Sequence, residues 1–171
     1  LNLEGKFTVP QAGDKKKLLE LSKKNAMLFM SEKTKQYEKL DPDLKVERLL
    51  KTIKSDLRLT ELPYHMECFD NSNIQGAFPV SACVVFKNGK PSKRDYRHFN
   101  IKTVEGPNDF ASMYEALTRR YSRLLKEEQP LPQLIIIDGG KGQLSSSVQA
   151  LKDLDLYGKI AIVGIAKRLE E

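Results

Sequence analysis

The sequence predicts an α/β protein: a mixed five-stranded sheet in the order 3-2-1-4-5, with helices on both faces and two further helices before it. Three patterns lead to this prediction. Apolar residues recur at helical spacing in the first third of the chain, alternate as in strands through the middle, and form short runs between helical stretches at the end. The last pattern is typical of parallel strands joined by helical crossovers.

The N-terminal third is expected to hold an extended arm and two helices. Residues 1–13 show no clear period, and Asp14 is interpreted as the cap of a helix that runs to about Lys39. Pro42 suits the start of a second helix, which is expected to end near Asp56. The lysines around the first helix could contact phosphates, but a solvated helix face is the commoner reason for such a pattern.

A β-meander is predicted next. Strands are expected over residues 64–70, 78–86 and 94–102, because each stretch mixes apolar residues with the alternation of a sheet. The dipeptide Asn88-Gly89 between the second and third strands is a strong signal for a tight hairpin turn.

A helix should follow the meander. Asn108 and Asp109 end the intervening loop, and both are helix-capping residue types. The predicted apolar face of this helix consists of Phe110, Met113, Leu117, Tyr121 and Leu124. Three arginines are expected largely off that face, namely Arg119, Arg120 and Arg123.

The C-terminal part completes the sheet. The apolar run 134–138 predicts a strand buried on both faces, residues 142–154 a helix, and residues 160–166 a fifth strand. We therefore divide the chain into residues 1–62, the arm and helices, and residues 63–171, the sheet domain, which we expect to be incomplete at its C-terminal end.

Two acids mark the predicted site. Asp70 and Asp138 end strands that are adjacent and parallel in this sheet order, so their carboxylates repel unless a cation lies between them. Oxygen ligands favour Mg²⁺ or Mn²⁺, which promote phosphodiester hydrolysis. The following Gly139-Gly140 leaves the backbone open to a metal or a phosphate, and Lys141 adds a positive charge. The alternative is an ordinary turn in which Asp138 caps the next helix.

Asp109 is the third candidate for this site. It contributes only if its loop folds back towards the same sheet edge, and as a residue at a helix start it is more readily explained as a cap than as a catalytic group. The cluster of Arg119, Arg120 and Arg123 could bind a phosphate backbone, or it could form a solvated helix face.

The overall composition narrows the class of protein. The 171 residues suffice for one domain, and a net charge of +6 favours an anionic partner, with nucleic acid first. No apolar run is long enough to span a bilayer, so no membrane partner is expected. Cys68 and Cys83 lie in apolar runs and are interpreted as buried, reduced thiols.

Several stretches of the chain are more specific than these patterns. They are ECFDNSNIQG (67–76), SACVVFKNGKP (81–91), YRHFNIK (96–102), NDFASM (108–113), LTRRY (117–121) and LIIIDGGKGQL (134–144). In this order they resemble the C-terminal endonuclease region of the UvrC family, a component of the bacterial UvrABC excision nuclease. The resemblance extends over nearly the whole chain.

The resemblance implies a ribonuclease H-like fold and metal-dependent incision of damaged DNA on the 5′ side of a lesion during nucleotide excision repair. It assigns catalytic and metal-binding positions to Asp70, Asp109 and Asp138, and so favours the catalytic interpretation of Asp109 over the cap. Where the family often has FDIS followed by His, this chain has Asn71-Ser72-Asn73, which could alter hydrogen bonding near Asp70.

The resemblance also implies parts that lie outside this sequence. The family's catalytic His and its helix-hairpin-helix module are expected beyond Glu171, and its second nuclease and the segment that binds UvrB before Leu1. The fragment is therefore expected to be monomeric, cytoplasmic and weakly active or inactive by itself. Two alternatives stay open: a non-catalytic module that docks DNA or a repair partner, and an actin-like ATP-binding fold, which lacks its Gly-rich phosphate hairpins here.

Overall fold

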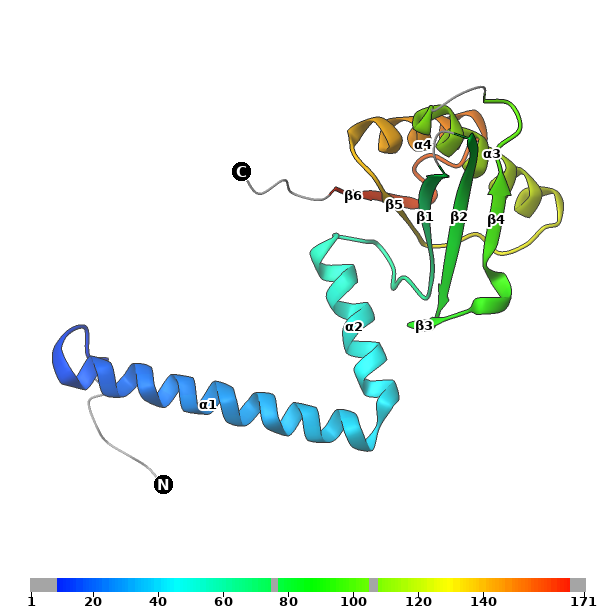
Figure 1. The fold of residues 1–171 in the computed structure, drawn as a ribbon. Helices are drawn as coiled ribbons and strands as arrows, with labels where there is room; N and C mark the ends of the chain where they lie inside the picture. The colour runs from blue at the N-terminus through cyan, green and yellow to red at the C-terminus, as the bar shows by residue number, and fades with distance from the viewer. Residues whose placement is uncertain (1–8, 75–76, 105–107, 167–171) are drawn as a thin grey trace. The chain divides into compact units, whose positions relative to one another are not determined.

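The computed structural model describes residues 9–74, 77–104 and 108–166 (Figure 1). The chain divides into two compact units, Leu1–Lys45 and Val46–Glu171, each of which is described by itself. The predicted boundary between residues 62 and 63 stays a prediction. Within the described residues, no helix is both long and apolar enough to cross a membrane.

The first unit consists mainly of the helix α1, Gly13–Leu40. Its N-cap is Ala12, so the prediction that Asp14 caps this helix was wrong by two positions. Asp14 instead lies in the first turn, where its carboxylate interacts favourably with the helix dipole. The next helix, α2, runs from Pro42 to Asp56 as predicted, and the Asp41 carboxylate accepts a hydrogen bond from the backbone N–H of Asp43.

The second unit contains a mixed six-stranded sheet. Its strands are β1 (His65–Ile74), β2 (Ala77–Lys87), β3 (Lys90–Pro91), β4 (Arg97–Asn100), β5 (Leu134–Asp138) and β6 (Ala161–Ile165). The order is β3-β2-β1-β5-β6, and β4 also pairs with β2. Strand β1 is antiparallel to β2 and parallel to β5, which is parallel to β6. The predicted order is confirmed, with β4 as the predicted third strand.

The predicted third strand differs from the observed one in its length. Residues expected to start it form a 3-10 turn, η1 (Lys93–Asp95), while the two-residue β3 pairs with β2 just after the hairpin. The Asp95 carboxylate explains the break, because it accepts hydrogen bonds from Ser92 and from Lys87, each at 2.7 Å. These bonds hold the chain in a turn, so pairing with β2 resumes only at Arg97.

Helices pack on both faces of the sheet. The helices α3 (Asp109–Lys126) and α4 (Lys141–Asp153) pack together on one face, as Figure 1 shows, around a core that includes Phe69, Ile135 and Ile137. The other face is packed by α2, whose buried Leu50 joins a second core with Met66, Leu134 and other residues. Alternate residues of β1 and β5 therefore serve different cores, as strand geometry requires.

Candidate active site

The two acids predicted at strand ends lie side by side, but only Asp138 ends its strand: β1 continues past Asp70 to Ile74, and Asp70 is the last β1 residue paired with β5. Asp70 of β1 and Asp138 of β5 are paired in register, and both side chains are exposed. Residues opposite each other in neighbouring strands project from the same face of a sheet. The pKa of the Cys68 thiol, two positions before Asp70, is raised first by burial and then by the negative charges of Asp138 and Asp70.

Neither carboxylate is bound by another side chain or backbone group of the described residues. Within the part of the chain that the structure describes, no hydrogen bond or ion pair reaches the side chain of Asp70 or of Asp138. Two adjacent, exposed carboxylates without protein donors carry unbalanced negative charge, which a cation would neutralise.

The loop after Asp138 excludes the interpretation of this acid as a helix cap. Helix α4 begins at Lys141 and its N-cap is Gly140, whose backbone N–H donates to the Gln143 side chain at 2.7 Å. A Cβ atom at Gly139 would lie 2.5 Å from that Gln143 oxygen, so a side chain there would displace Gln143 from its bond to Gly140. The first turn of α4 is thus capped without Asp138.

Asp109 is the first residue of α3, and the cap of this helix is its neighbour. The Asn108 side chain accepts a hydrogen bond from the Ala111 backbone N–H at 3.0 Å. The backbone carbonyl of Asp109 accepts a hydrogen bond from the Asn71 side chain at 2.9 Å. Because Asn71 directly follows Asp70, this bond holds the start of α3 at the end of β1.

A second contact ties the start of α3 to the start of α4. The ring of Phe110 packs so closely on Gly142 that a Cβ atom at Gly142 would clash with it. Gly142 lies four residues after Asp138, so Phe110 and Asn71 together bring the backbone of Asp109 to the ends of both acid-bearing strands. The fold therefore places the backbone of Asp109 near Asp70 and Asp138.

The residues at this edge fit a divalent cation in part. Among the described residues, no group of three or more His, Cys, Asp or Glu side chains is arranged to hold a metal ion. The paired carboxylates of Asp70 and Asp138 nevertheless supply the oxygen donors that Mg²⁺ and Mn²⁺ prefer. A complete site would need the Asp109 side chain, or another donor, to join them.

The predicted basic residues separate into different surroundings. Lys141 is exposed at the start of α4. Arg119 donates to the Asn100 carbonyl at 2.7 Å and to Glu115 at 2.9 Å, and Arg123 is exposed. Arg120 was predicted off the apolar face of α3 and is instead buried, only 9% exposed. Arg120 is therefore separated from the exposed Arg119 and Arg123.

The burial of Arg120 is explained by a residue that sequence reasoning missed, Glu67. The Glu67 carboxylate is fully buried and accepts two hydrogen bonds from Arg120, at 2.6 and 3.2 Å. The Tyr121 hydroxyl donates to it at 3.0 Å, and His65 Nε2 lies 3.2 Å away. Although burial opposes its charge, the hydrogen bonds from His65 and Arg120 lower the Glu67 pKa to about 2.

The sequence did contain a signal for this cluster. Glu67 and Phe69 are two positions apart on β1, so they face the same side of the sheet, and Phe69 belongs to its core. An acid on that face needs a buried cation, and Arg120 is the arginine that lies next to the buried Tyr121. The pairing could not be read directly, because the two partners are 53 residues apart.

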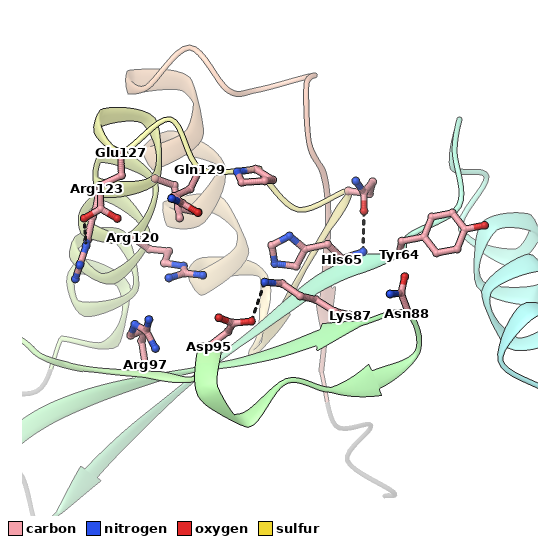
Figure 2. A pocket seen from close by; sticks show the side chains of 13 residues that line it. Tyr64, His65, Lys87, Asn88, Asp95, Arg97, Arg120, Arg123, Glu127 and Gln129 are labelled. Atoms are coloured by element: carbon pink, nitrogen blue, oxygen red, sulfur yellow. Dashed lines mark hydrogen bonds and ion pairs between the residues drawn. The ribbon is translucent and has the colours of Figure 1, made fainter. Parts of the chain in front are cut away.

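A pocket of about 500 Å³ lies at the opposite end of β1 from the acids, near His65 and Lys87 (Figure 2). Three of its cationic side chains are paired with acids: Lys87 with Asp95 at 2.7 Å, Arg123 with Glu127 at 2.7 Å, and Arg120 with Glu67. Arg97, which also lines the pocket, donates instead to the backbone carbonyls of Arg94 and Tyr96.

The sheet order and the acids at the last pair of the parallel β1–β5 ladder define a ribonuclease H-like α/β domain. The family model of the UvrC RNAse H endonuclease domain matches residues 54–171, and the chain belongs to this family.

Curated relatives agree with this assignment. The chain is 68% identical to the UvrABC system protein C of Flavobacterium psychrophilum over 166 residues, which are 97% of this chain and 28% of that protein. It is 66% identical to the UvrABC system protein C of Christiangramia forsetii over 168 residues, again 28% of the relative. The chain therefore spans little more than a quarter of the length of these relatives.

Solved structures are more distant. The endonuclease V of Ciona intestinalis, in complex with DNA containing an inosine, aligns with 75% of this chain and 60% of its own at a TM-score of 0.45 and 18% identity. Human ENDOV aligns with 72% of this chain and 60% of its own at a TM-score of 0.46 and 16% identity. Likeness at this level says nothing about the site.

Proposed function

We propose that this chain is the part of an excision nuclease that hydrolyses a phosphodiester bond on the 5′ side of a lesion in damaged DNA. The observation that carries the proposal is the pairing of Asp70 with Asp138, both exposed and without a protein partner among the described residues. Family membership supports the reaction class, and DNA is the substrate and partner.

The three acids and Lys141 have different roles at this site. Asp70 and Asp138 would hold Mg²⁺ or Mn²⁺ where β1 and β5 end their pairing, and Asp109 would complete the set of ligands from the start of α3. A cation held there would supply an activated water and charge stabilisation for the attacking and leaving oxygens. Lys141, exposed just after the glycine pair, contributes positive charge towards the phosphate. UvrB binds through other regions of the longer protein, in the bacterial cytoplasm.

The test of this function is an incision assay with the full-length protein that carries this domain, its UvrA and UvrB partners, and a duplex with a single lesion. Asp138→Asn keeps the size of the side chain but removes its charge. We expect it to reduce the 5′ incision rate by about a thousandfold, as does loss of an electrostatic group in other active sites. The 3′ incision should be unchanged.

Asp155→Asn is the matched control. Asp155 is an exposed acid with a left-handed backbone, φ 56°, which asparagine adopts readily. This variant should cut at the wild-type rate. An unchanged 5′ incision rate in Asp138→Asn would refute the proposed function.

The non-catalytic docking module is the alternative that this assay also addresses. It predicts that the chain binds DNA with the usual dependence on salt concentration. It also predicts that Asp138→Asn reduces neither the incision rate nor the binding of Mn²⁺. Membership of an endonuclease domain family argues against the other alternative, the actin-like ATP-binding fold.

A further inference from the structure

The register of the sheet extends the line of the two acids across two more strands. Asp138 of β5 pairs with Asp70 of β1, Asp70 pairs with Ala82 of β2, and Ala82 pairs with His98 of β4. Residues paired in this way project from the same face of a sheet. The four side chains therefore form a single row across the sheet: Asp138, Asp70, Ala82 and His98.

Burial along β2 and β4 confirms which face this is. Ser81, Cys83 and Phe99 are buried on the face covered by α3 and α4. The residues between them, Ala82 and His98, therefore project from the opposite face, where His98 is exposed and Ala82 is partly exposed.

Within the unit Val46–Glu171, helix α2 packs on one end of this second face. The core that includes Leu50 of α2 contains Met66 and Phe86, which are partners in register near the start of β1. The row that contains Asp70 lies four residues further along β1, and both its acids and His98 are exposed. Asn100, also exposed, follows two residues after His98 and projects from the same face.

The dimensions of the row suit one strand of a nucleic acid. Neighbouring strands of a sheet lie about 4.8 Å apart, so His98 lies roughly 10 Å from Asp70 across Ala82. Phosphates follow one another every 3.4 Å or so along the axis of one DNA strand. A strand cut at Asp70 and Asp138 would thus reach His98 within a few nucleotides, and the small side chain of Ala82 leaves its path open.

We propose that the DNA strand to be cut crosses this face of the sheet from Asp70 and Asp138, over Ala82, to His98 and Asn100. His98 and Asn100 donate hydrogen bonds to backbone phosphates, which are the groups that every DNA sequence presents. His98 is a positioning residue, because it holds the strand at a distance from the reacting bond. The inference rests on the proposed function and adds the direction in which the substrate leaves the site.

The test uses the full-length protein that carries this domain and a lesion-containing duplex. His98→Ala removes the donor and should raise the KM of the 5′ incision about tenfold, since hydrogen bonds to charged groups are the stronger ones, while kcat stays within twofold. His98→Arg restores a donor of similar reach and should return KM towards the wild-type value. Ala82→Leu should raise KM as well, by filling the path between donor and acids.

Arg97→Ala is the matched control. Arg97 is the neighbour of His98 in the sequence and carries a full positive charge, but it lines the pocket on the other face of the sheet (Figure 2). If only net charge mattered, Arg97→Ala would weaken DNA binding at least as much as His98→Ala. The proposed path predicts that its KM is unchanged.

A second readout follows the DNA directly. A photoreactive benzoylphenylalanine in place of His98 should cross-link to the incised strand, and the same group in place of Arg97 should not. Cross-links from position 98 only to another protein segment, or a KM for His98→Ala equal to wild type, would overturn the path. Neither result would affect the nuclease proposal, which fails only if Asp138→Asn still cuts.

Discussion

Glu67 and Asp70 are three residues apart on β1, yet they differ in burial and in hydrogen-bond partners. Glu67 faces the core of the sheet and is surrounded by hydrogen-bond donors from Arg120, Tyr121 and His65. Asp70 projects from the other face, where the pairing of β1 with β5 ends, and it is exposed with no partner for its side chain among the described residues. The contrast shows that an acid supplied with donors by the protein is structural, whereas one left without them is available to a ligand.

The buried acid also supports the exposed ones. Glu67 is joined to Arg120 of α3, so it fastens the strand that bears Asp70 to the helix that begins with Asp109. Because removal of one partner leaves a charge buried alone, such a pair is costly to break. The two faces of β1 should therefore differ in what their acids control: stability at Glu67 and activity at Asp70.

The largest expected effect on stability comes from Glu67→Ala. It leaves the Arg120 guanidinium buried without its partner, and we expect a loss of about 3–5 kcal/mol in the free energy of unfolding. Urea denaturation of this chain, followed by circular dichroism, measures it. Glu61→Ala, at an exposed acid, should stay within about 0.5 kcal/mol of wild type. Equal stabilities for the two variants would remove the distinction between the buried and the exposed acid.

The pH dependence of stability sharpens the same comparison. The folded-state pKa of Glu67 is lowered from 4.5 to about 2, so its contribution is complete above pH 4.5 and is lost as the pH falls towards 2. That shift corresponds to about 3 kcal/mol. Unfolding free energies of wild type and Glu67→Gln, compared between pH 6 and pH 3, should converge as the pH falls. A constant difference between them would contradict the assigned pKa.

A smaller effect is expected where the two acid-bearing elements meet. Asn71→Ala removes the hydrogen bond to the Asp109 carbonyl and should destabilise the chain by about 1 kcal/mol. The full-length variant should lose about tenfold in 5′ incision, because the start of α3 is then held less firmly beside Asp70. Gln149→Ala, which removes an exposed hydrogen bond to Asp153 on α4, is the control and should cut normally. Full activity in Asn71→Ala would show that 5′ incision does not depend on holding Asp109 beside Asp70.

Much of the fold followed from local patterns. The Ile-rich run that ends in Asp138 and the alternation that ends in Asp70 predicted both strands, and the sheet order made the two acids neighbours, as the register confirms. The assignment of the three acids to a metal site was not tested by the fold and stays a prediction. Sequence patterns sufficed here because each strand carries its own signal of length and burial.

Features that depend on distant partners were missed. The break before β4 depends on the bond between Asp95 and Lys87, which belong to different elements. The burial of Arg120 depends on Glu67, and a charged residue near the edge of a helix face does not reveal such a partner. The choice between Asn108 and Asp109 as the cap of α3 depended on backbone geometry at two equally suitable residues.

The most direct test of the central claim is a titration of this chain with Mn²⁺, followed through the backbone amide signals in NMR spectra. Paramagnetic Mn²⁺ broadens the signals of nearby nuclei even when it binds weakly. The account predicts that the amides of Asp70 and Asp138 broaden first, that those of His65 and Lys87 at the other end of the strands stay sharp, and that Asp70→Asn abolishes the effect. Equal broadening in Asp70→Asn, or broadening centred on His65, would contradict it.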